Sequence, residues 1–271
     1  MIPRAHITAW RERAPWPSDA QVEQDLVITR ALVEMFSRAP IAESLAFRGG
    51  TALHKLHVGR AARYSEDIDL VQIDAGPIGA VLGEVRAALD PWLGDPSWKQ
   101  SSDSVKLVYR FDTTTLPVQR MRVKIEINTR EHFSCRGLRG RGFSVDTLWF
   151  TGAAVITTYD LEELLGTKLR ALYQRKKGRD LYDLWSAFKA LAVEAGGVVD
   201  CFARYMASDG ATVTRAMFEE NLAEKLASDP FRGDVFPLLR VGEAYDVEEA
   251  ARLVHERLVQ RLPGEPWRGR M

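Results

Sequence analysis

The 271 residues are 46% hydrophobic and 27% charged, a composition that fits one large globular domain or two smaller ones. The 37 Lys and Arg residues balance 37 Asp and Glu residues. This zero formal net charge excludes a global attraction to nucleic acid or to an anionic membrane, so a polyanion site must come from local clusters. No segment approaches the ~20 consecutive apolar residues of a membrane span.

The cysteines and the N-terminus indicate the cellular location. Cys135 and Cys201 lie far apart, and two thiols in a chain of this length predict no disulfide framework and fit a reducing cytosol. Residues 1–16 contain three arginines but no apolar run, so they do not form a signal peptide. We therefore expect a cytoplasmic protein with no membrane partner.

The first predicted elements lead to a pair of glycines. Residues 18–39 have capping-box spacing at their start and an apolar stripe at helical intervals, which predicts a helix that ends before the following proline. The short apolar run 45–48 predicts a strand, and residues 51–57 are typical of the first turns of a second helix. Gly49 and Gly50 are therefore expected at a strand-to-helix junction.

Strand patterns dominate the middle of the chain. Residues 67–73 alternate between polar and apolar side chains over most of their length, which predicts a strand. A helix is predicted over 77–93, and two further strands over 104–112 and 122–131. Residues 135–144 are rich in glycine and arginine without a packing pattern, so we expect a loop there.

Helical periodicity takes over in the second half of the chain. A capped apolar helix is predicted from Asp160 onwards, Gly178 interrupts it, and another helix follows over 179–191. The remaining segments also have helical patterns. The predicted fold class is therefore α+β, with an α+β domain over 1–155 and a helical domain over 156–271.

Two carboxylates on the first of the middle strands suggest a metal site. Asp67 and Asp69 share one face of that strand, with Cα atoms ~6.5–7 Å apart, and like charges repel unless a cation lies between them. Mg²⁺ (or Mn²⁺) takes few carboxylates and completes its shell with water and phosphate oxygens. Glu126, on the polar face of another strand pattern, is the candidate third ligand. A solvated strand face is the alternative for the aspartates alone.

Arg48, Gly49, Gly50 and Thr51 form a candidate phosphate-binding turn beside this metal site. Glycines let backbone N–H groups approach phosphate closely, a helix N-terminus favours anions, and Thr51 adds a hydroxyl. A tight turn is the alternative for Gly49 and Gly50 by themselves. Because the turn lies just upstream of the two aspartates, the combination indicates a site for a nucleoside triphosphate and its metal ion.

Charged side chains in the predicted helices suit the same substrate. Lys168 and Arg175 are seven residues apart and are expected on one helix face, where they would neutralise a triphosphate and the departing pyrophosphate. Arg179 opens the next helix, and Asp180 or Asp183 is placed to orient such a cation. A solvated helix face is the alternative for each of these residues taken singly.

Another group of arginines is suited to a nucleic-acid backbone, with surface solubility as the alternative. These residues are Arg120, Arg122, Arg136, Arg139 and Arg141.

Four stretches, spanning residues 47–184, together resemble a known family: they read FRGGTALHKLH, YSEDIDL, KIEIN and TKLRALYQRKKGRDLYDL. They resemble the AbiEii/AbiGii-type nucleotidyltransferase toxins, including the mycobacterial MenT branch. The resemblance implies a DNA-polymerase-β-like nucleotidyltransferase core with a helical C-terminal domain. It also implies a toxin of a bacterial toxin–antitoxin pair, with a separately encoded antitoxin protein, and relatives that transfer nucleotides, often pyrimidines, to the 3′ end of tRNA and so stop translation.

The resemblance carries roles over to residues already singled out, and it adds one serine. The phosphate-binding turn of the family matches Gly49, Gly50 and Thr51. The metal-binding stretch matches Ser65, Asp67 and Asp69. Ser65 also matches a serine that can be phosphorylated in the family. The family's helix lysine matches Lys168, and its RDxxD element matches Arg179, Asp180 and Asp183.

The resulting hypothesis is a Mg²⁺-dependent nucleotidyltransferase in which a 3′-hydroxyl of tRNA attacks the α-phosphate of an NTP and pyrophosphate leaves. Glu126 would assist in deprotonating the hydroxyl, and Lys168 and Arg175 would bind triphosphate oxygens. One alternative is nucleotidyl transfer to a small molecule or to a protein hydroxyl, including that of Ser65. Another is a catalytically idle module that binds nucleotide or antitoxin.

Overall fold

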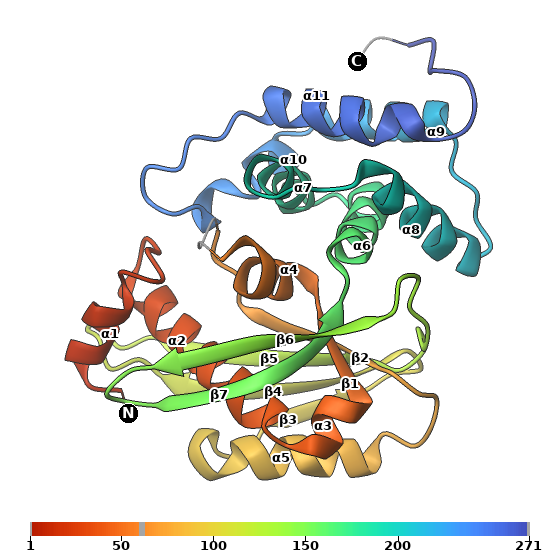
Figure 1. The fold of residues 1–271 in the computed structure, drawn as a ribbon. Coiled ribbons are helices and arrows are strands. Elements are labelled where there is room, and N and C mark those ends of the chain that lie inside the picture. The colour runs from red at the N-terminus through yellow and green to blue at the C-terminus, as the bar shows by residue number, and fades with distance from the viewer. Residues whose placement is uncertain (1, 60–62, 270–271) are drawn as a thin grey trace. The chain divides into compact units, whose positions relative to one another are not determined.

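Within residues 2–59 and 63–269, which this computed structural model describes, the first part of the chain is built on a seven-stranded mixed sheet (Figure 1). The contacts divide the chain into two compact units, Met1–Tyr159 and Asp160–Met271, here called unit 1 and unit 2. The sheet belongs to unit 1, and unit 2 is helical.

The strands of unit 1 lie in the order β3-β4-β5-β2-β1-β7-β6, which places β2 in the middle. β1 is antiparallel to β2 and parallel to β7, and β2 is parallel to β5. The strands are β1 (Leu45–Arg48), β2 (Asp67–Gln72), β3 (Ser97–Gln100), β4 (Ser104–Asp112), β5 (Arg120–Asn128), β6 (Leu138–Asp146) and β7 (Thr151–Tyr159). The predicted strands around residues 45, 67, 104 and 122 are therefore present.

The helices of unit 1 cover both sides of this sheet; α5 and α4 lie on opposite sides of it in Figure 1. The buried side chains Ile68, Val105 and Ile125 come from one face of the sheet, and Tyr109 of that face donates a 2.7 Å hydrogen bond to Asp90 of α5. The helical segments are α1 (Arg4–Trp10), α2 (Asp19–Phe36), α3 (Ala39–Ser44), α4 (Gly49–Ala52), the π-helical segment Leu53–Val58 and α5 (Gly79–Leu93). The other face of β2 and β5 carries the polar side chains.

The first long helix begins as predicted and ends earlier. Ser18 and Gln21 form a capping box, in which each side chain accepts a hydrogen bond from the backbone of the other. The helix ends at Phe36, and Pro40 lies in the first turn of α3, where the missing N–H of proline has no intrahelical partner to lose.

The loop predicted over residues 135–144 is wrong, because most of it forms the edge strand β6. All nine residues of β6, Leu138–Asp146, pair with β7 in an unbroken antiparallel register. Glycine lowers strand propensity, so the signal is weak in the sequence, and the pairing with β7 supplies the order. The domain boundary predicted between residues 155 and 156 falls inside β7, whereas unit 1 ends at Tyr159 and unit 2 begins at Asp160.

Unit 2 is built around the crossing of its first and third helices. A Cβ at Gly166 of α6 would approach the carbonyl oxygen of Val198 in α8 to 3.0 Å, so a glycine is needed for the helices to pack this closely. The helices are α6 (Leu161–Gln174), α7 (Gly178–Ala190), α8 (Ala195–Ser208), α9 (Arg215–Leu226), α10 (Asp229–Gly233) and α11 (Val247–Arg257), with 3-10 turns at Phe236–Leu238 and Val259–Arg261.

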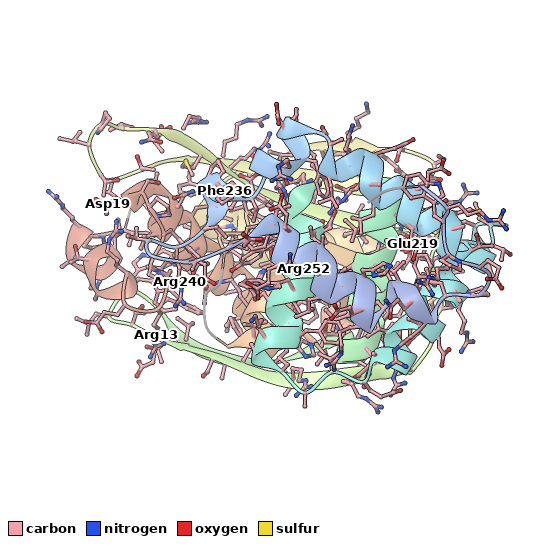
Figure 2. The ribbon with its side chains drawn as sticks, turned by 90° about the horizontal axis from the view of Figure 1, so that it is seen from above. Arg13, Asp19, Glu219, Phe236, Arg240 and Arg252 are labelled. Atoms are coloured by element: carbon pink, nitrogen blue, oxygen red, sulfur yellow. The ribbon has the colours of Figure 1, made fainter. Side chains whose placement is uncertain are left out.

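The C-terminal segment is tied to α9 and α11 by one buried carboxylate. Glu219, labelled in Figure 2, accepts hydrogen bonds of 2.7 Å from Arg215 Nε and His255 Nε2. It also accepts a 2.6 Å bond from the backbone N–H of Trp267. Among the helices of the described part of the chain, none is long and apolar enough to cross a membrane.

Candidate active site

The two aspartates predicted as metal ligands lie on the polar face of the central strand. Asp67 and Asp69 are half-buried, whereas Ile68 between them is fully buried on the opposite face. In the parallel pairing of β2 with β5, Asp67 is the register partner of Lys124 and Asp69 that of Glu126. The register therefore gathers three carboxylates of the prediction on one side of the sheet.

Two lysines are interleaved with these carboxylates. Lys124 Nζ lies 3.0 Å from Asp67 Oδ2 and 3.2 Å from Glu126 Oε2, and Lys106 Nζ of β4 lies 3.0 Å from Glu126 Oε1. Burial alone would raise the pKa of Glu126, but the two lysines outweigh it and lower that pKa below its usual value. Burial lowers the pKa of Lys124, and the carboxylates of Asp67 and Glu126 reverse the shift and raise it.

The glycine turn follows β1 directly and lies against the second aspartate. Arg48 pairs with Asp69 in the β1–β2 register, and Gly49 continues into α4 with φ +83°, a conformation that side-chain-bearing residues rarely adopt. A Cβ at Gly49 would overlap the carboxylate of Asp69. The absence of a side chain at position 49 therefore creates the space in which that carboxylate sits.

Hydroxyl groups connect the turn to the strand of aspartates. Thr51 Oγ1 lies 2.8 Å from Ser65 Oγ and 2.5 Å from the carbonyl oxygen of Asp67, to which it donates. Thr51 is almost fully buried. The predicted residues Gly49, Thr51 and Ser65 are thus part of one packed arrangement, although they come from segments separated by a long connection.

Arg48 is engaged within unit 1. Its guanidinium forms a hydrogen-bonded ion pair with Glu131, which follows β5. Burial lowers the pKa of Arg48, but the charges of Glu131, Tyr159 and Asp69 outweigh burial and raise it above the ordinary value. A permanent positive charge therefore lies at the start of the glycine turn.

The charged residues predicted in unit 2 form a buried cluster at the meeting of α6 and α7. Lys168 Nζ lies 2.8 Å from Asp183 Oδ2 and 3.4 Å from Asp180 Oδ1. Both aspartates are fully buried and Lys168 nearly so. Three residues apart on α7, the aspartates share a face, and this explains how one ammonium group contacts both.

Arg175 takes a different place from that predicted, whereas Arg179 lies in the first turn of α7, as expected. Arg175 lies just beyond the end of α6 in an extended conformation, so it does not share a helix face with Lys168, but its guanidinium makes two hydrogen bonds of 2.6 and 2.7 Å to Asp180. Arg179 makes a bidentate pair with Asp234, at 2.9 and 3.0 Å. The hydrogen bond to Asp234 raises the pKa of Arg179 above its ordinary value, and burial, which lowers that pKa, offsets only part of the shift.

The carboxylates of unit 1 suit a hard divalent cation. Asp67 and Asp69 offer oxygen ligands on one face, and the room that Gly49 leaves is occupied by the Asp69 carboxylate itself. Magnesium commonly uses one or two protein carboxylates and takes its other ligands from water and substrate phosphates. In the described ranges, no three His, Cys, Asp or Glu side chains converge as a metal site, so the third-ligand role of Glu126 stays a prediction.

The family of the chain follows from its sequence as a whole. The sequence model of the family described as nucleotidyl transferase AbiEii toxin, type IV toxin–antitoxin system, matches residues 30–253. The chain belongs to this AbiEii family. Its members are nucleotidyltransferase toxins, so the predicted family and the predicted enzyme class are confirmed. No curated relative matches the AbiEii chain by sequence.

Solved structures share the fold of this AbiEii protein. MenT4, a nucleotidyltransferase toxin from Mycobacterium tuberculosis H37Rv, has a TM-score of 0.67 and 20% identity, covering 97% of this chain and 91% of that one. JHP933 from Helicobacter pylori has a TM-score of 0.54 and 18% identity, covering 90% of this chain and 95% of that one. At these identities the likeness concerns the fold, and it confirms the predicted nucleotidyltransferase architecture.

Several charged residues of the AbiEii chain were missed by sequence reasoning. Lys106 and Lys124 appear among the carboxylates only when strand register is known, and Asp234 becomes the partner of Arg179 only through the tertiary packing of α10. Arg63 lies against Gly50. In the sequence, only its position four residues before Asp67 indicated that Arg63 could belong to the site.

Proposed function

We propose that this AbiEii protein is a toxin that transfers nucleotides, preferably pyrimidine nucleotides, from NTPs to the 3′ end of tRNA and thereby blocks translation. The observation that carries the proposal is the packing of the Asp69 carboxylate against Gly49. It joins a carboxylate pair suited to a metal ion and a turn suited to phosphate in a single site, which is the combination that nucleotidyl transfer requires.

In this proposal, Asp67 and Asp69 hold a Mg²⁺ ion (or Mn²⁺), which when bound supplies positive charge to the reacting phosphate oxygens. The backbone N–H groups of Gly49, Gly50 and Thr51 contact the triphosphate. The Ser65 hydroxyl lies 2.8 Å from Thr51 Oγ1 and completes the polar wall of the turn. Arg48 adds a fixed positive charge at the edge of the turn.

Within unit 2, the buried cluster of α6 and α7 would supply cations for phosphate groups. Lys168 provides an ammonium group whose position is fixed by Asp180 and Asp183, so little side-chain freedom is lost when an anion binds to it. Arg175 is about half exposed while it pairs with Asp180, so its guanidinium can be reached by a phosphate group. We assign Arg179 a positioning role, because its guanidinium is held by Asp234 at the start of α7.

The reaction balances with these groups. The oxygen of a 3′-hydroxyl forms a bond to the α-phosphorus of the NTP, the bond from that phosphorus to the bridging oxygen breaks, and pyrophosphate leaves with its electrons. We assign Glu126, the register neighbour of Asp69, the role of accepting the proton of the hydroxyl. The cations of the site stabilise the negative charge of the departing pyrophosphate.

We further propose that a separately encoded antitoxin neutralises the enzyme, as membership of a type IV toxin–antitoxin family implies. Cytoplasmic tRNA and NTPs are the substrates, so the proposal places the protein in the cytoplasm.

A labelling experiment tests the proposal. Purified protein, Mg²⁺ and total bacterial tRNA are incubated with each of the four NTPs in turn, labelled at the α-phosphate. We expect label on tRNA from one or two pyrimidine NTPs with the wild type, and none with Asp69→Asn. The matched control is Asp112→Asn, which removes an exposed carboxylate of β4 paired with Arg120 and should retain activity. Label on a small acceptor or on the protein instead of RNA would overturn the tRNA assignment.

A further inference from the structure

The second glycine of the turn lies against a positively charged side chain. A Cβ at Gly50 would overlap Nη2 of Arg63 and lie 3.3 Å from Oγ of Ser65. Arg63 thus takes the place that a side chain at position 50 would need. The two glycines consequently contact opposite charges, since Gly49 faces the carboxylate of Asp69 and Gly50 faces a guanidinium.

Arg63 is also a buried cation. It is 3% exposed, and its Nη1 donates a 3.0 Å hydrogen bond to the carbonyl oxygen of Tyr64. Withdrawing a guanidinium from water is unfavourable unless its surroundings compensate for the lost hydration. A buried arginine directly against the glycine turn is therefore expected to have a role that a neutral apolar residue cannot fill.

The location of Arg63 indicates that role. Its guanidinium lies against Gly50, whose N–H group belongs to the proposed triphosphate contact, and the hydroxyl of Ser65 lies near the same position of the turn. Since the guanidinium is planar and always charged, it can support a backbone segment sterically while adding positive potential for an anion above it. At 3% exposure, Arg63 acts on the substrate through the turn instead of by extensive direct contact.

We propose that Arg63 is a positioning residue of the nucleotidyltransferase site, which fixes Gly50 and Ser65 in the geometry that receives the polyphosphate of the NTP. The inference rests on the proposed function, because it assumes that the turn binds polyphosphate. It explains why position 50 must be glycine even though its φ, unlike that of Gly49, is not in the left-handed region.

Equilibrium binding separates this role from a general contribution to folding. Inorganic tripolyphosphate and an α,β-methylene NTP are titrated by calorimetry, with Mg²⁺, into the full chain and into its Arg63→Met and Arg63→Lys variants. We expect Arg63→Met to weaken both ligands by about tenfold or more, the scale of a lost interaction with a charged group. Arg63→Lys keeps the charge without the planar group and should restore part of the affinity.

The matched control is Arg30→Met. The Arg30 guanidinium is packed over Trp92, 4.1 Å from the ring centroid, and forms an ion pair with Glu34. Its loss should lower the thermal midpoint while leaving the affinity of the folded protein for both ligands unchanged. If Arg63→Met likewise lowers only the midpoint and binds both ligands as the wild type does, Arg63 is merely structural and the inference is wrong.

A double-mutant cycle tests the contact with Gly50 directly. Gly50→Ala introduces a methyl group where Arg63 Nη2 lies, so it should weaken ligand binding in the wild-type background and have little further effect in an Arg63→Ala background. Additive effects of the two changes would contradict the inference. This cycle is also read from urea unfolding, which needs no ligand and remains informative if a variant binds too weakly to titrate.

The outcomes distinguish the inference from the function on which it rests. A wild type that binds neither tripolyphosphate nor the NTP analogue overturns both. A wild type that binds both ligands, together with Arg63→Met binding equally well, overturns only the role of Arg63. Weakened binding in Arg63→Met, partial recovery in Arg63→Lys and a non-additive cycle with Gly50→Ala support the role.

Discussion

The ammonium group of Lys124 lies 3.0 Å from the carboxylate of Asp67, on the face of the sheet where we place the metal ion. Lys124 therefore neutralises part of the charge that attracts the cation, and the two compete for the same oxygens. The pair is about one-quarter exposed on each side, so the competition is moderate in strength.

The first prediction follows from this competition. Lys124→Gln should tighten Mn²⁺ binding in the absence of nucleotide by about two- to fivefold, the range of a partly exposed ion pair. The measurement is a titration of free Mn²⁺ by electron paramagnetic resonance. Lys106→Gln is the control, because the ion pair of Lys106 is with Glu126, whereas Lys124 also pairs with Asp67. Unchanged or weaker Mn²⁺ binding in Lys124→Gln would contradict the placement of the ion at Asp67.

The second prediction separates two effects of a side chain at Gly49. Gly49→Ala introduces backbone strain at φ +83° and an overlap with Asp69, whereas Gly94→Ala introduces backbone strain at φ +77° with no atom within 4 Å. The backbone strain should lower the free energy of unfolding by about 1–3 kcal/mol in each variant, and the overlap with Asp69 should add to the loss in Gly49→Ala. Only Gly49→Ala should lose transferase activity, by ~100-fold, because it displaces the carboxylate that we propose as a metal ligand. Equal activity losses in the two variants would count against the site.

The third prediction concerns the buried cluster of unit 2. Lys168→Met leaves Asp183 buried without the ammonium group 2.8 Å away, and removing one partner of a buried ion pair costs about 3–5 kcal/mol. Asp183→Asn keeps the shape and should cost less. Urea unfolding measures both. A Lys168→Met protein as stable as the wild type would show that the cluster does not stabilise the junction of α6 and α7.

The fourth prediction is a dependence of stability on pH. Burial opposes ionisation of Glu219, but Arg215, His255 and the backbone N–H of Trp267 outweigh burial and lower its pKa below the ordinary 4.5. A carboxylate whose pKa is lower in the folded state stabilises the protein above the unfolded-state pKa and loses that contribution as the pH falls through the folded-state value. The contribution of Glu219 is therefore complete above about pH 4.5 and declines in more acidic solution.

Glu219→Gln tests this sign, because it removes the titration while keeping the shape. The difference in the free energy of unfolding between wild type and variant should shrink as the pH is lowered below about 4.5. Limited proteolysis near Trp267 gives a second readout, since the variant weakens the attachment of the C-terminal segment. A difference that stays constant across this pH range would show that Glu219 is not the group responsible.

The sequence predicted those parts of the fold that depend on residues close together in the chain. The alternation of Asp67 to Leu70, the capping box at Ser18 and the glycine turn each depend on residues adjacent in sequence, and all are present. β6 was missed because its glycines hide the strand pattern, and its order comes from pairing with β7.

In the candidate site, too, some residues could be predicted from a single segment, whereas others depend on contacts between segments. Asp67 and Asp69 were identifiable because a strand puts residues two apart on one face. Lys124 depends on the register of β5 against β2, and Arg63 on the packing of one segment against the backbone of another. Both relationships are set by tertiary contacts, which a pattern within a single segment does not encode.

The central claim is transfer to the 3′ end of tRNA, and oxidation of that end by periodate tests it most directly. Periodate converts the terminal 2′,3′-diol to a dialdehyde and removes the attacking hydroxyl without changing the rest of the molecule. With α-labelled NTP and Mg²⁺, we predict that wild-type protein labels intact tRNA and leaves oxidised tRNA unlabelled. Equal labelling of both tRNAs, or of neither while another acceptor is labelled, would contradict the account.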